Sequence, residues 1–288
     1  MIGHEDLIED FKKLANKERL SHAYLFFGEP QVGKFLFSQH LANFLENKLF
    51  ELPISFLNET FFISPVDGTI GIDAVRSLKR FLYQKPVISK WRIAIIRDAE
   101  NLTNEAQNAV LKILEEPPVQ SLIIFIADNY DNLSSTILSR FQKIYFSRVS
   151  SGEIEKFLIK KYKINQDKAK KIIVESFGRP GRAIDLFENK NLGNIRKMAK
   201  EFLRIDNLRV RRRFIKEKFI NKSSTYTHVG GKEDKFDDYI IDKFFEFLII
   251  ELCKDRIKNL NGLQEIFKRL TLIKQFNVNK KLQISALY

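Results

Sequence analysis

A short apolar run, a glycine loop and a helical pattern follow one another near the start of the chain, and this order constrains the fold more than any other feature. The run AYLFF (23–27) is typical of a buried strand and ends at Gly28. The loop GEPQVGK comes next, and the segment FLFSQHLANFLEN after it has the apolar spacing of a helix. A strand, a glycine turn and a helix in this order predict an α/β unit.

Apolar segments continue to alternate with helical patterns up to about residue 148. Strands are expected at 61–64, 91–100, 121–128 and 143–147, and helices at 5–19, 71–84, 102–116 and 132–141. Buried strands that alternate with amphipathic helices favour a parallel sheet covered on both faces. We therefore predict an α/β domain with a parallel sheet over residues 1–148.

Only helical patterns follow this first part of the chain. A helix should begin at Ser150 or Ser151, since either serine can cap it and Glu153 lies in its first turn. The segment GRPGR (178–182) interrupts the helical pattern, and a polar break at 221–234 is expected to be a loop. We predict a small helical domain over 149–192 and a larger one over 193–288, so that the fold class is α/β plus all-α.

The charge of the chain is unevenly distributed. The formal net charge is +13, and the whole excess lies after residue 148. A basic half is typical of proteins that meet a polyanion or an acidic partner, although a solvated set of lysine-rich helices is an equal alternative. The basic run 209–219 (RVRRRFIKEKF) is open to both interpretations.

Cysteine and hydropathy exclude several classes of protein. Cys253 is the single cysteine, so neither an internal disulfide nor a thiolate zinc site can form, and its apolar surroundings predict a buried structural residue. The four histidines are scattered, and we expect no metal site. The acidic N-terminus is unlike a signal peptide, and no apolar stretch approaches the length of a membrane span. We expect a cytoplasmic protein without a membrane contact.

The glycine loop matches the first seven positions of the P-loop pattern GxxxxGK. Gly28 and Gly33 would let backbone N–H groups curl around phosphate oxygens, and Lys34 would reach the β- and γ-phosphates. The eighth position should be Ser or Thr, whose hydroxyl binds Mg²⁺, but here it is Phe35. An aromatic ring cannot coordinate a cation that requires oxygen ligands.

The second metal-binding element should be an acidic pair at the end of a buried strand. The strand RIAII is followed by Arg97, Asp98, Ala99 and Glu100. Aligned by strand length, Arg97 takes the position of the metal-binding Asp and Asp98 that of the Glu that polarises water. An alternative alignment makes Asp98 and Glu100 the two carboxylates. With the first alignment the site is degenerate, and we expect weak or no binding of ATP or ADP, and no turnover.

The segment from Ile93 to Arg140 resembles one family. IIRDAENLTNEAQNAVLKILEEPP is similar to the clamp-loader segment of bacterial DNA polymerase III, a member of the AAA+ superfamily, and Ser139-Arg140-Phe141 is similar to its Ser-Arg-Cys motif. SHAYLFFGEPQVGK (21–34), GRPGRAIDL (178–186) and NVNKKLQISAL (277–287) resemble the family's P-loop approach, lid segment and final collar helix. The resemblance implies that the three predicted domains are an AAA+ P-loop domain, a lid and a collar.

This resemblance carries implications for activity and partners. The family contains ATP-hydrolysing gamma/tau subunits and a non-hydrolysing delta-prime subunit, and Phe35 and Arg97 favour the second. Arg140 matches the arginine finger that such a subunit presents in trans to the ATP site of a neighbour. On residue chemistry alone, Arg140 could simply cap the helix that precedes it. The implied partners are the gamma/tau and delta subunits in a hetero-pentamer and, through that complex, the beta sliding clamp and primer–template DNA.

Other positions of the pattern are altered too. The lid arginine that senses nucleotide in active subunits would lie near Gly181, with Arg182 beside it, and Asp128 and Asn129 stand where a sensor Thr is expected. The family's four-cysteine zinc module is absent, so zinc is not expected. Three alternatives remain: an active gamma/tau-type ATPase, a stand-alone basic nucleic-acid-binding module, and a small-molecule P-loop kinase.

Overall fold

The computed structural model describes residues 1–220, 233–253 and 260–276. They belong to two compact units, Met1–Ile184 and Asp185–Tyr288. Most of the expected loop 221–234 lies outside the described residues, as does the expected final helix 277–287. Within the described residues no helix is long and apolar enough to cross a membrane.

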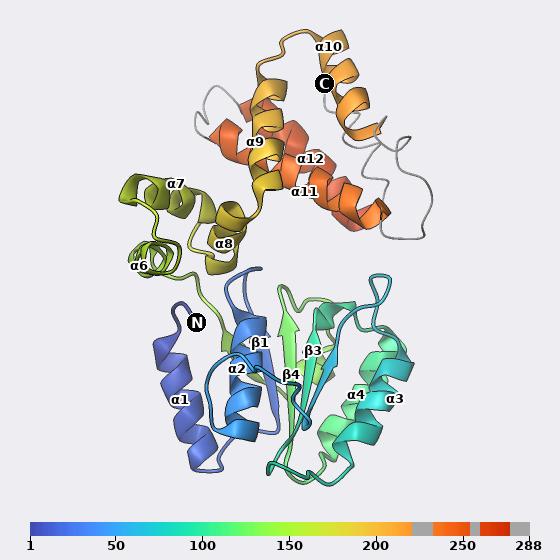
Figure 1. The fold of residues 1–288 in the computed structure, drawn as a ribbon. Coiled ribbons are helices and arrows are strands. Elements are labelled where there is room, and N and C mark those ends of the chain that lie inside the picture. Colours follow the sequence, from blue (N-terminus) through green and yellow to red (C-terminus); the bar gives the residue numbers. More distant parts are fainter. Residues whose placement is uncertain (221–232, 254–259, 277–288) are drawn as a thin grey trace. The chain divides into compact units, whose positions relative to one another are not determined.

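The first unit contains all five strands and eight helices among its described residues (Figure 1). In chain order they are α1 (Glu5–Asn16), β1 (Ala23–Phe27), α2 (Lys34–Asn47), β2 (Thr60–Ile63), α3 (Ile72–Leu82), β3 (Arg92–Arg97), the 3₁₀ turn η1 (Ala99–Asn101), α4 (Asn104–Glu115), β4 (Ser121–Ala127), α5 (Ser135–Leu138), β5 (Gln142–Tyr145), α6 (Ser151–Tyr162), α7 (Gln166–Ser176) and α8 (Pro180–Glu188). The last helix, α8, crosses the boundary between the two units.

The strands form one parallel sheet in the order β2-β3-β4-β1-β5. The expected parallel sheet is therefore confirmed. Strand β4 lies between β1 and β3, and its register pairs Ala127 with Phe27 on one side and Ile126 with Arg97 on the other. The carboxyl ends of these three strands thus lie at the same level of one sheet edge.

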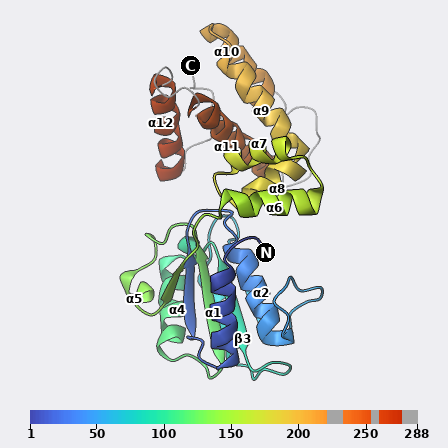
Figure 2. The ribbon, with the colours of Figure 1, turned by 90° about the vertical axis from the view of Figure 1, so that its left-hand side faces the viewer.

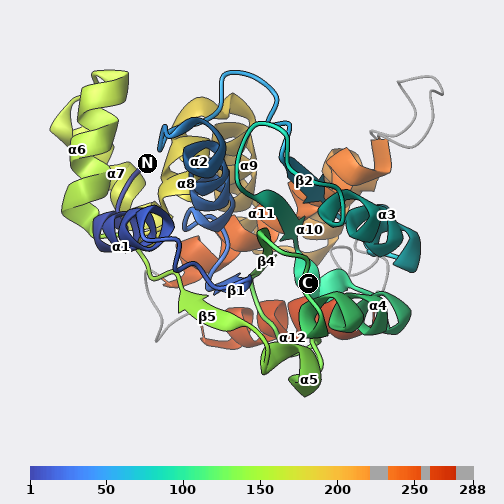
Figure 3. The same cartoon turned by 90° about the horizontal axis from the view of Figure 1, so that it is seen from below.

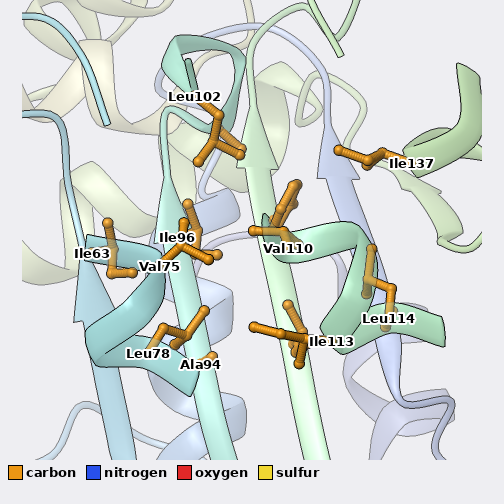
Figure 4. Packing of buried hydrophobic residues seen from close by; sticks show 14 of the residues in the cluster. Ile63, Val75, Leu78, Ala94, Ile96, Leu102, Val110, Ile113, Leu114 and Ile137 are labelled. Atoms are coloured by element: carbon orange, nitrogen blue, oxygen red, sulfur yellow. The ribbon is translucent and has the colours of Figure 1, made fainter. Parts of the chain in front are cut away.

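Both faces of the sheet are covered, because successive side chains of a strand point to opposite faces. In β1, Ala23 and Leu25 pack with α3 and α4, whereas Tyr24 and Phe26 pack with α1 and α2. Figure 3 shows the two helix pairs on opposite sides of the strands, and in Figure 2 α1 lies in front of them. Figure 4 shows the first of these cores, where side chains of α3 and α4 meet those of β2 and β3. Near-continuous apolar strands are the expected consequence of burial on both faces.

Two helix caps agree with the local sequence. Thr103 caps α4 by accepting a hydrogen bond from the Ala106 N–H at 3.2 Å, and Ser150 and Glu153 form a capping box at the start of α6.

The helix expected over 132–141 is wrong in length, because α5 has only four residues. Phe141 is buried 4.5 Å from the ring of Phe125, and this anchor turns the chain toward β5.

Buried charges hold two loops at the amino end of the sheet. Glu59, only 1% exposed, accepts hydrogen bonds from the N–H groups of Val87 and Ile88, both at 2.7 Å. Its carboxylate also pairs with the buried guanidinium of Arg92 at 2.7 Å. Arg92 in turn donates to the carbonyl oxygen of Lys85 at 2.9 Å. The loop between α3 and β3 is therefore tied to the start of β2.

The second unit is entirely helical within its described residues. It contains α9 (Lys190–Leu203), α10 (Leu208–Ile215), the π-helical turn η2 (Lys216–Ile220), α11 (Glu233–Leu252) and α12 (Leu260–Phe276). Helix α11 packs against α9 and α12, around a core rich in phenylalanine. Cys253, expected to be a buried structural residue, packs against this core but is only partly buried.

Candidate functional site

The P-loop segment lies at the carboxyl edge of the sheet, where β1, β4 and β3 end side by side (Figure 1). The loop follows β1, Asp128 follows β4, and Asp98 follows β3. This edge is where parallel α/β sheets place their ligand sites, since loops and helix N-termini converge there. The fold thus brings together three of the sequence segments that were singled out.

The glycines of the loop are required by its backbone. Gly28 and Gly33 have φ angles of 136° and 111°, in a region that other residues rarely adopt. A Cβ atom on Gly28 would lie 2.5 Å from the carbonyl oxygen of Phe146, so β1 and the chain after β5 approach each other through this glycine. Gly33 is the N-cap of α2, and its carbonyl accepts the N–H of Phe37 at 2.9 Å.

Lys34 is almost completely buried, and groups of the protein itself surround its ammonium group. Nζ donates to the carbonyl oxygens of Gly28 at 2.5 Å and Glu29 at 2.7 Å, and to Oδ1 of Asp128 at 2.7 Å. An ammonium group has three N–H donors, so these three contacts use all of them. The carboxylate of Asp128 thus accepts a hydrogen bond from one of the N–H donors with which a P-loop lysine binds phosphate oxygen.

The two residues that are expected at degenerate metal positions contact each other. The guanidinium of Arg97 lies 5.2 Å from the centre of the Phe35 ring, in cation–π distance. The Phe62 ring also packs against Phe35 in a T-shaped arrangement, with a centroid separation of 6.0 Å. Neither Phe35 nor Arg97 supplies an oxygen ligand for Mg²⁺, so the residues at these positions do not fit that metal. No cluster of three His, Cys, Asp or Glu side chains suited to a metal occurs within residues 1–220, 233–253 and 260–276.

The carboxylates after β3 lie in a partly desolvated place. Burial raises the pKa of Asp98, while the Arg97 guanidinium, 3.6 Å from its Oδ2, acts in the opposite direction. Burial also raises the pKa of Glu100, whose Oε1 accepts the N–H of Asp128 at 3.3 Å. Asp98 adopts a left-handed backbone conformation with φ of 51°. The nearby carboxylate of Asp128 also acts to raise the pKa of both acids, and among the described residues neither forms an ion pair with Lys34.

The loop also contacts the first residues of α8. The carbonyl oxygen of Gln31 accepts the N–H of Gly181 at 3.0 Å, and a Cβ atom on Gly181 would lie 3.1 Å from that oxygen. A side chain at this lid position would therefore press against the loop. The neighbouring Arg182 is 3% exposed, with its guanidinium 5.8 Å from the centre of the Phe177 ring.

A further ion pair joins the loop to the end of the sheet domain. Both Nε and Nη2 of Arg148 donate to Oε1 of Glu29, at 2.9 and 2.6 Å. The hydrogen bond from Arg148 lowers the pKa of the Glu29 carboxyl. Both side chains are substantially exposed, so the pair orients the loop more than it stabilises the fold.

Arg140 lies outside this cluster, directly after α5. Nη2 donates to Oε1 of Glu115 at 2.8 Å, and Nη1 donates to the carbonyl oxygen of Thr136 at 2.7 Å. The second contact is the helix-capping interaction that residue chemistry alone suggested. The side chain is one third exposed, and burial of the adjacent Phe141 fixes the backbone that carries it.

The sequence pattern singled out the loop and the residues expected at degenerate metal positions, but it did not reveal the partners of these side chains. The contacts of Lys34 with Asp128, of Glu29 with Arg148 and of Arg140 with Glu115 join residues 25 or more positions apart. The periodic spacing of apolar residues in a sequence does not indicate such long-range contacts. Asp128 at a position expected to hold Thr was the only signal available for the first of them.

Comparison with known proteins shows similarity to subunits of DNA polymerase III. Residues 55–150 match the family model described as "DNA polymerase III, delta subunit". The DNA polymerase III subunit gamma/tau of Mycoplasma genitalium is 25% identical over 97% of this chain and 51% of its own length. The DNA polymerase III subunit delta' of Escherichia coli is 29% identical over 46% of this chain and 40% of its own length. The chain thus spans about half the length of the first relative and less of the second.

Solved structures show the same fold. A gamma subunit-related protein of DNA polymerase III from Thermotoga maritima superposes with a TM-score of 0.60 and 19% identity, covering 96% of each chain. The Holliday junction branch migration motor RuvB from the same organism superposes with a TM-score of 0.52 and 13% identity, covering 97% of this chain and 83% of its own.

The parallel sheet, the P-loop at its carboxyl edge and these structural neighbours define the α/β fold of AAA+ proteins, so the expected fold class is confirmed. Within that class, residues 55–150 are similar to the DNA polymerase III delta subunit family, and the similar curated proteins are DNA polymerase III gamma/tau, gamma and delta' subunits, which supports a clamp-loader subunit of AAA+ type.

Proposed function

We propose that the chain is a delta-prime-type subunit of the DNA polymerase III clamp loader, without ATPase activity of its own. The observation that carries this proposal is the contact between Phe35 and Arg97. Phosphoryl transfer needs a metal that bridges the β- and γ-phosphates. At the two positions that should bind this metal, the chain has an aromatic ring and a guanidinium that pack on each other. This supports the alignment in which Arg97 replaces the metal-binding Asp.

The surroundings of Lys34 support weak or no binding of ATP or ADP. A phosphate would have to displace Asp128 or a loop carbonyl from the ammonium group, because all three donors are engaged. The close packing of Gly181 on Gln31 also argues against a lid residue that senses nucleotide. We propose no zinc and no other resident cofactor.

Arg140 is proposed as an arginine finger for the ATP site of a neighbouring subunit. Its guanidinium is permanently charged, partly exposed, and attached to a backbone that the buried Phe141 holds in place. Glu115 and Thr136 hold the side chain in the isolated subunit, and a γ-phosphate would have to compete with them. The proposed partners are gamma/tau and delta subunits in a cytoplasmic hetero-pentamer, and through it the sliding clamp and primer–template DNA.

Reconstitution with gamma/tau and delta subunits tests the proposal. With this chain the complex should assemble and show DNA-stimulated ATPase activity. Replacing Arg140 by Ala should lower that activity by a factor of about 10³ at the site served by the finger, without preventing assembly. Arg76→Ala is a matched control, since Arg76 is another exposed arginine paired with a carboxylate, Asp73, at 2.8 Å.

Equal ATPase activity of the Arg140→Ala and Arg76→Ala complexes would contradict the finger role. A second candidate is an active gamma/tau-type subunit, which is favoured by the alignment of 97% of the chain with a gamma/tau relative. That candidate requires ATP turnover by the isolated chain, abolished by Lys34→Ala. The delta-prime-type function predicts no such turnover.

A further inference from the structure

Four cations form a continuous stripe on one face of the second unit's α10 and the turn after it. The stripe consists of Arg209, Arg212, Arg213 and Lys216. Their spacing of i, i+3, i+4 and i+7 places them within an arc of about 100° around the helix axis. All four side chains are exposed. This set is called the basic stripe below.

The opposite face of the same segment is firmly attached to the helical core. Ile215 and Phe219 are 1% and 6% exposed in the cluster that α9 and α11 share. Arg211 lies with its guanidinium 5.3 Å from the centre of the Phe202 ring, and its Nε donates to the carbonyl oxygen of Ile205 at 2.5 Å. The core therefore fixes which face points outward, and the stripe is presented on a rigid support.

The stripe gathers like charges on one helix. Arg209 lies in the first turn of α10, where the helix dipole favours negative charge, whereas Arg212 and Arg213 lie in the last turn, where it favours cations. Like charges at spacings of three and four residues repel each other by a few tenths of a kcal/mol per pair. Glu217 pairs with Arg213 at 2.8 Å, but both are largely exposed and this contact is worth little. An anionic ligand would relieve these repulsions.

We propose that the basic stripe binds the phosphodiester backbone of nucleic acid, independently of base sequence. Three of its four cations are arginines, whose planar guanidinium binds phosphate through two hydrogen bonds. The stripe spans about 10 Å along the helix axis, the length of about three phosphates of one strand. Aromatic rings in this segment turn to the core, as with Phe219, so contact with bases is not expected.

An acidic protein surface fits the stripe less well. Centres of protein interfaces are apolar and depleted in charge. Among the described residues of α10, the only large apolar side chain that is strongly exposed is Val210, at 49%. A row of arginines with so little apolar surface is better suited to a regularly spaced polyanion.

The test measures binding of the full chain to a blunt-ended fluorescent duplex by anisotropy, over salt concentrations from about 50 to 200 mM. Replacing all four stripe cations by Gln should reduce the slope of log K against log salt by about 3, because each lost phosphate contact contributes about 0.9. The control replaces Lys156, Lys160, Lys170 and Lys171, four exposed lysines of α6 and α7, by Gln. It removes the same charge and should leave most of the slope intact.

Three results would overturn the proposal: no DNA affinity of the unaltered chain, equal slopes for the two variants, or a stripe variant that loses assembly with loader subunits but keeps its DNA affinity. The last result would make the stripe a protein interface. Circular dichroism melting verifies that both variants fold. The ATPase of the reconstituted loader is a separate readout, so a failure here leaves the proposed function untouched.

Discussion

Lys34 carries its charge in a nearly inaccessible place, and the carboxylate of Asp128 compensates it. A buried ammonium group without a counter-ion would be strongly destabilising. The two loop carbonyls complete its hydrogen bonds, but they carry no net charge. The pair with Asp128 therefore compensates the charge of Lys34 without an external anion.

The variant Asp128→Asn tests whether the carboxylate of Asp128 keeps external anions from Lys34. The amide keeps the shape but removes the negative charge, so the Lys34 ammonium becomes available to an external anion. The variant should lose about 1–2 kcal/mol of stability, a moderate value because the Asp128 side chain is 46% exposed. Pyrophosphate should then raise its melting temperature more than that of the unaltered chain.

Asp131→Asn is the control, since it removes an exposed carboxylate from the same loop. Thermal melting with and without pyrophosphate compares the three proteins. An equal response of the Asp128 and Asp131 variants would show that the carboxylate of Asp128 does not shield Lys34.

Among the elements, the loop between α3 and β3 depends on one buried carboxylate. Glu59→Ala removes the acceptor for two N–H groups and leaves the Arg92 guanidinium buried without its counter-ion. The expected loss is about 3–5 kcal/mol of unfolding free energy. Trp91, the single tryptophan, precedes Arg92 and reports the transition by its fluorescence in urea.

Asp73→Ala is the matched control, because it breaks the pair with Arg76 on the exposed side of α3. It should cost less than about 1 kcal/mol. A similar loss in both variants would mean that burial of the Glu59–Arg92 pair does not determine how much it contributes to the unfolding free energy.

The elements also show which parts of the fold were predictable. Strands such as 121–127 could be recognised because burial on both faces demands an unbroken apolar run. The order of strands, with β4 between β1 and β3, follows from tertiary pairing and leaves no local pattern. The four-residue length of α5 was missed for the same reason, since the packing of Phe141 on Phe125 overrides helical spacing. For the site, residue types suggested degenerate metal positions at Phe35 and Arg97, whereas the ion pairs join residues far apart in sequence and left no local pattern.

At the scale of the whole molecule, the chain consists of two units with separate cores. Phe245 of α11 is fully buried in the second unit. Phe245→Ala should cost that unit about 3–5 kcal/mol. Because Trp91 belongs to the first unit, its fluorescence midpoint should stay unchanged while the helical signal in circular dichroism is lost earlier.

Phe26→Ala is the reciprocal variant, since Phe26 is fully buried in the first unit. It should shift the Trp91 midpoint strongly. If Phe245→Ala shifts that midpoint equally, the two units unfold as one cooperative structure and the prediction is wrong.

The contact between Phe35 and Arg97 has a consequence for the evolutionary history open to this chain. Residues in contact have coupled mutational effects, so neither position can change without altering the setting of the other. A hydroxyl at position 35 alone would face a guanidinium, and a carboxylate at position 97 alone would face an aromatic ring. Neither single step restores a metal site, and each loses an attractive contact. The two changes that would bring oxygen ligands to these positions are therefore coupled, and either one alone removes the attractive contact between the guanidinium and the ring.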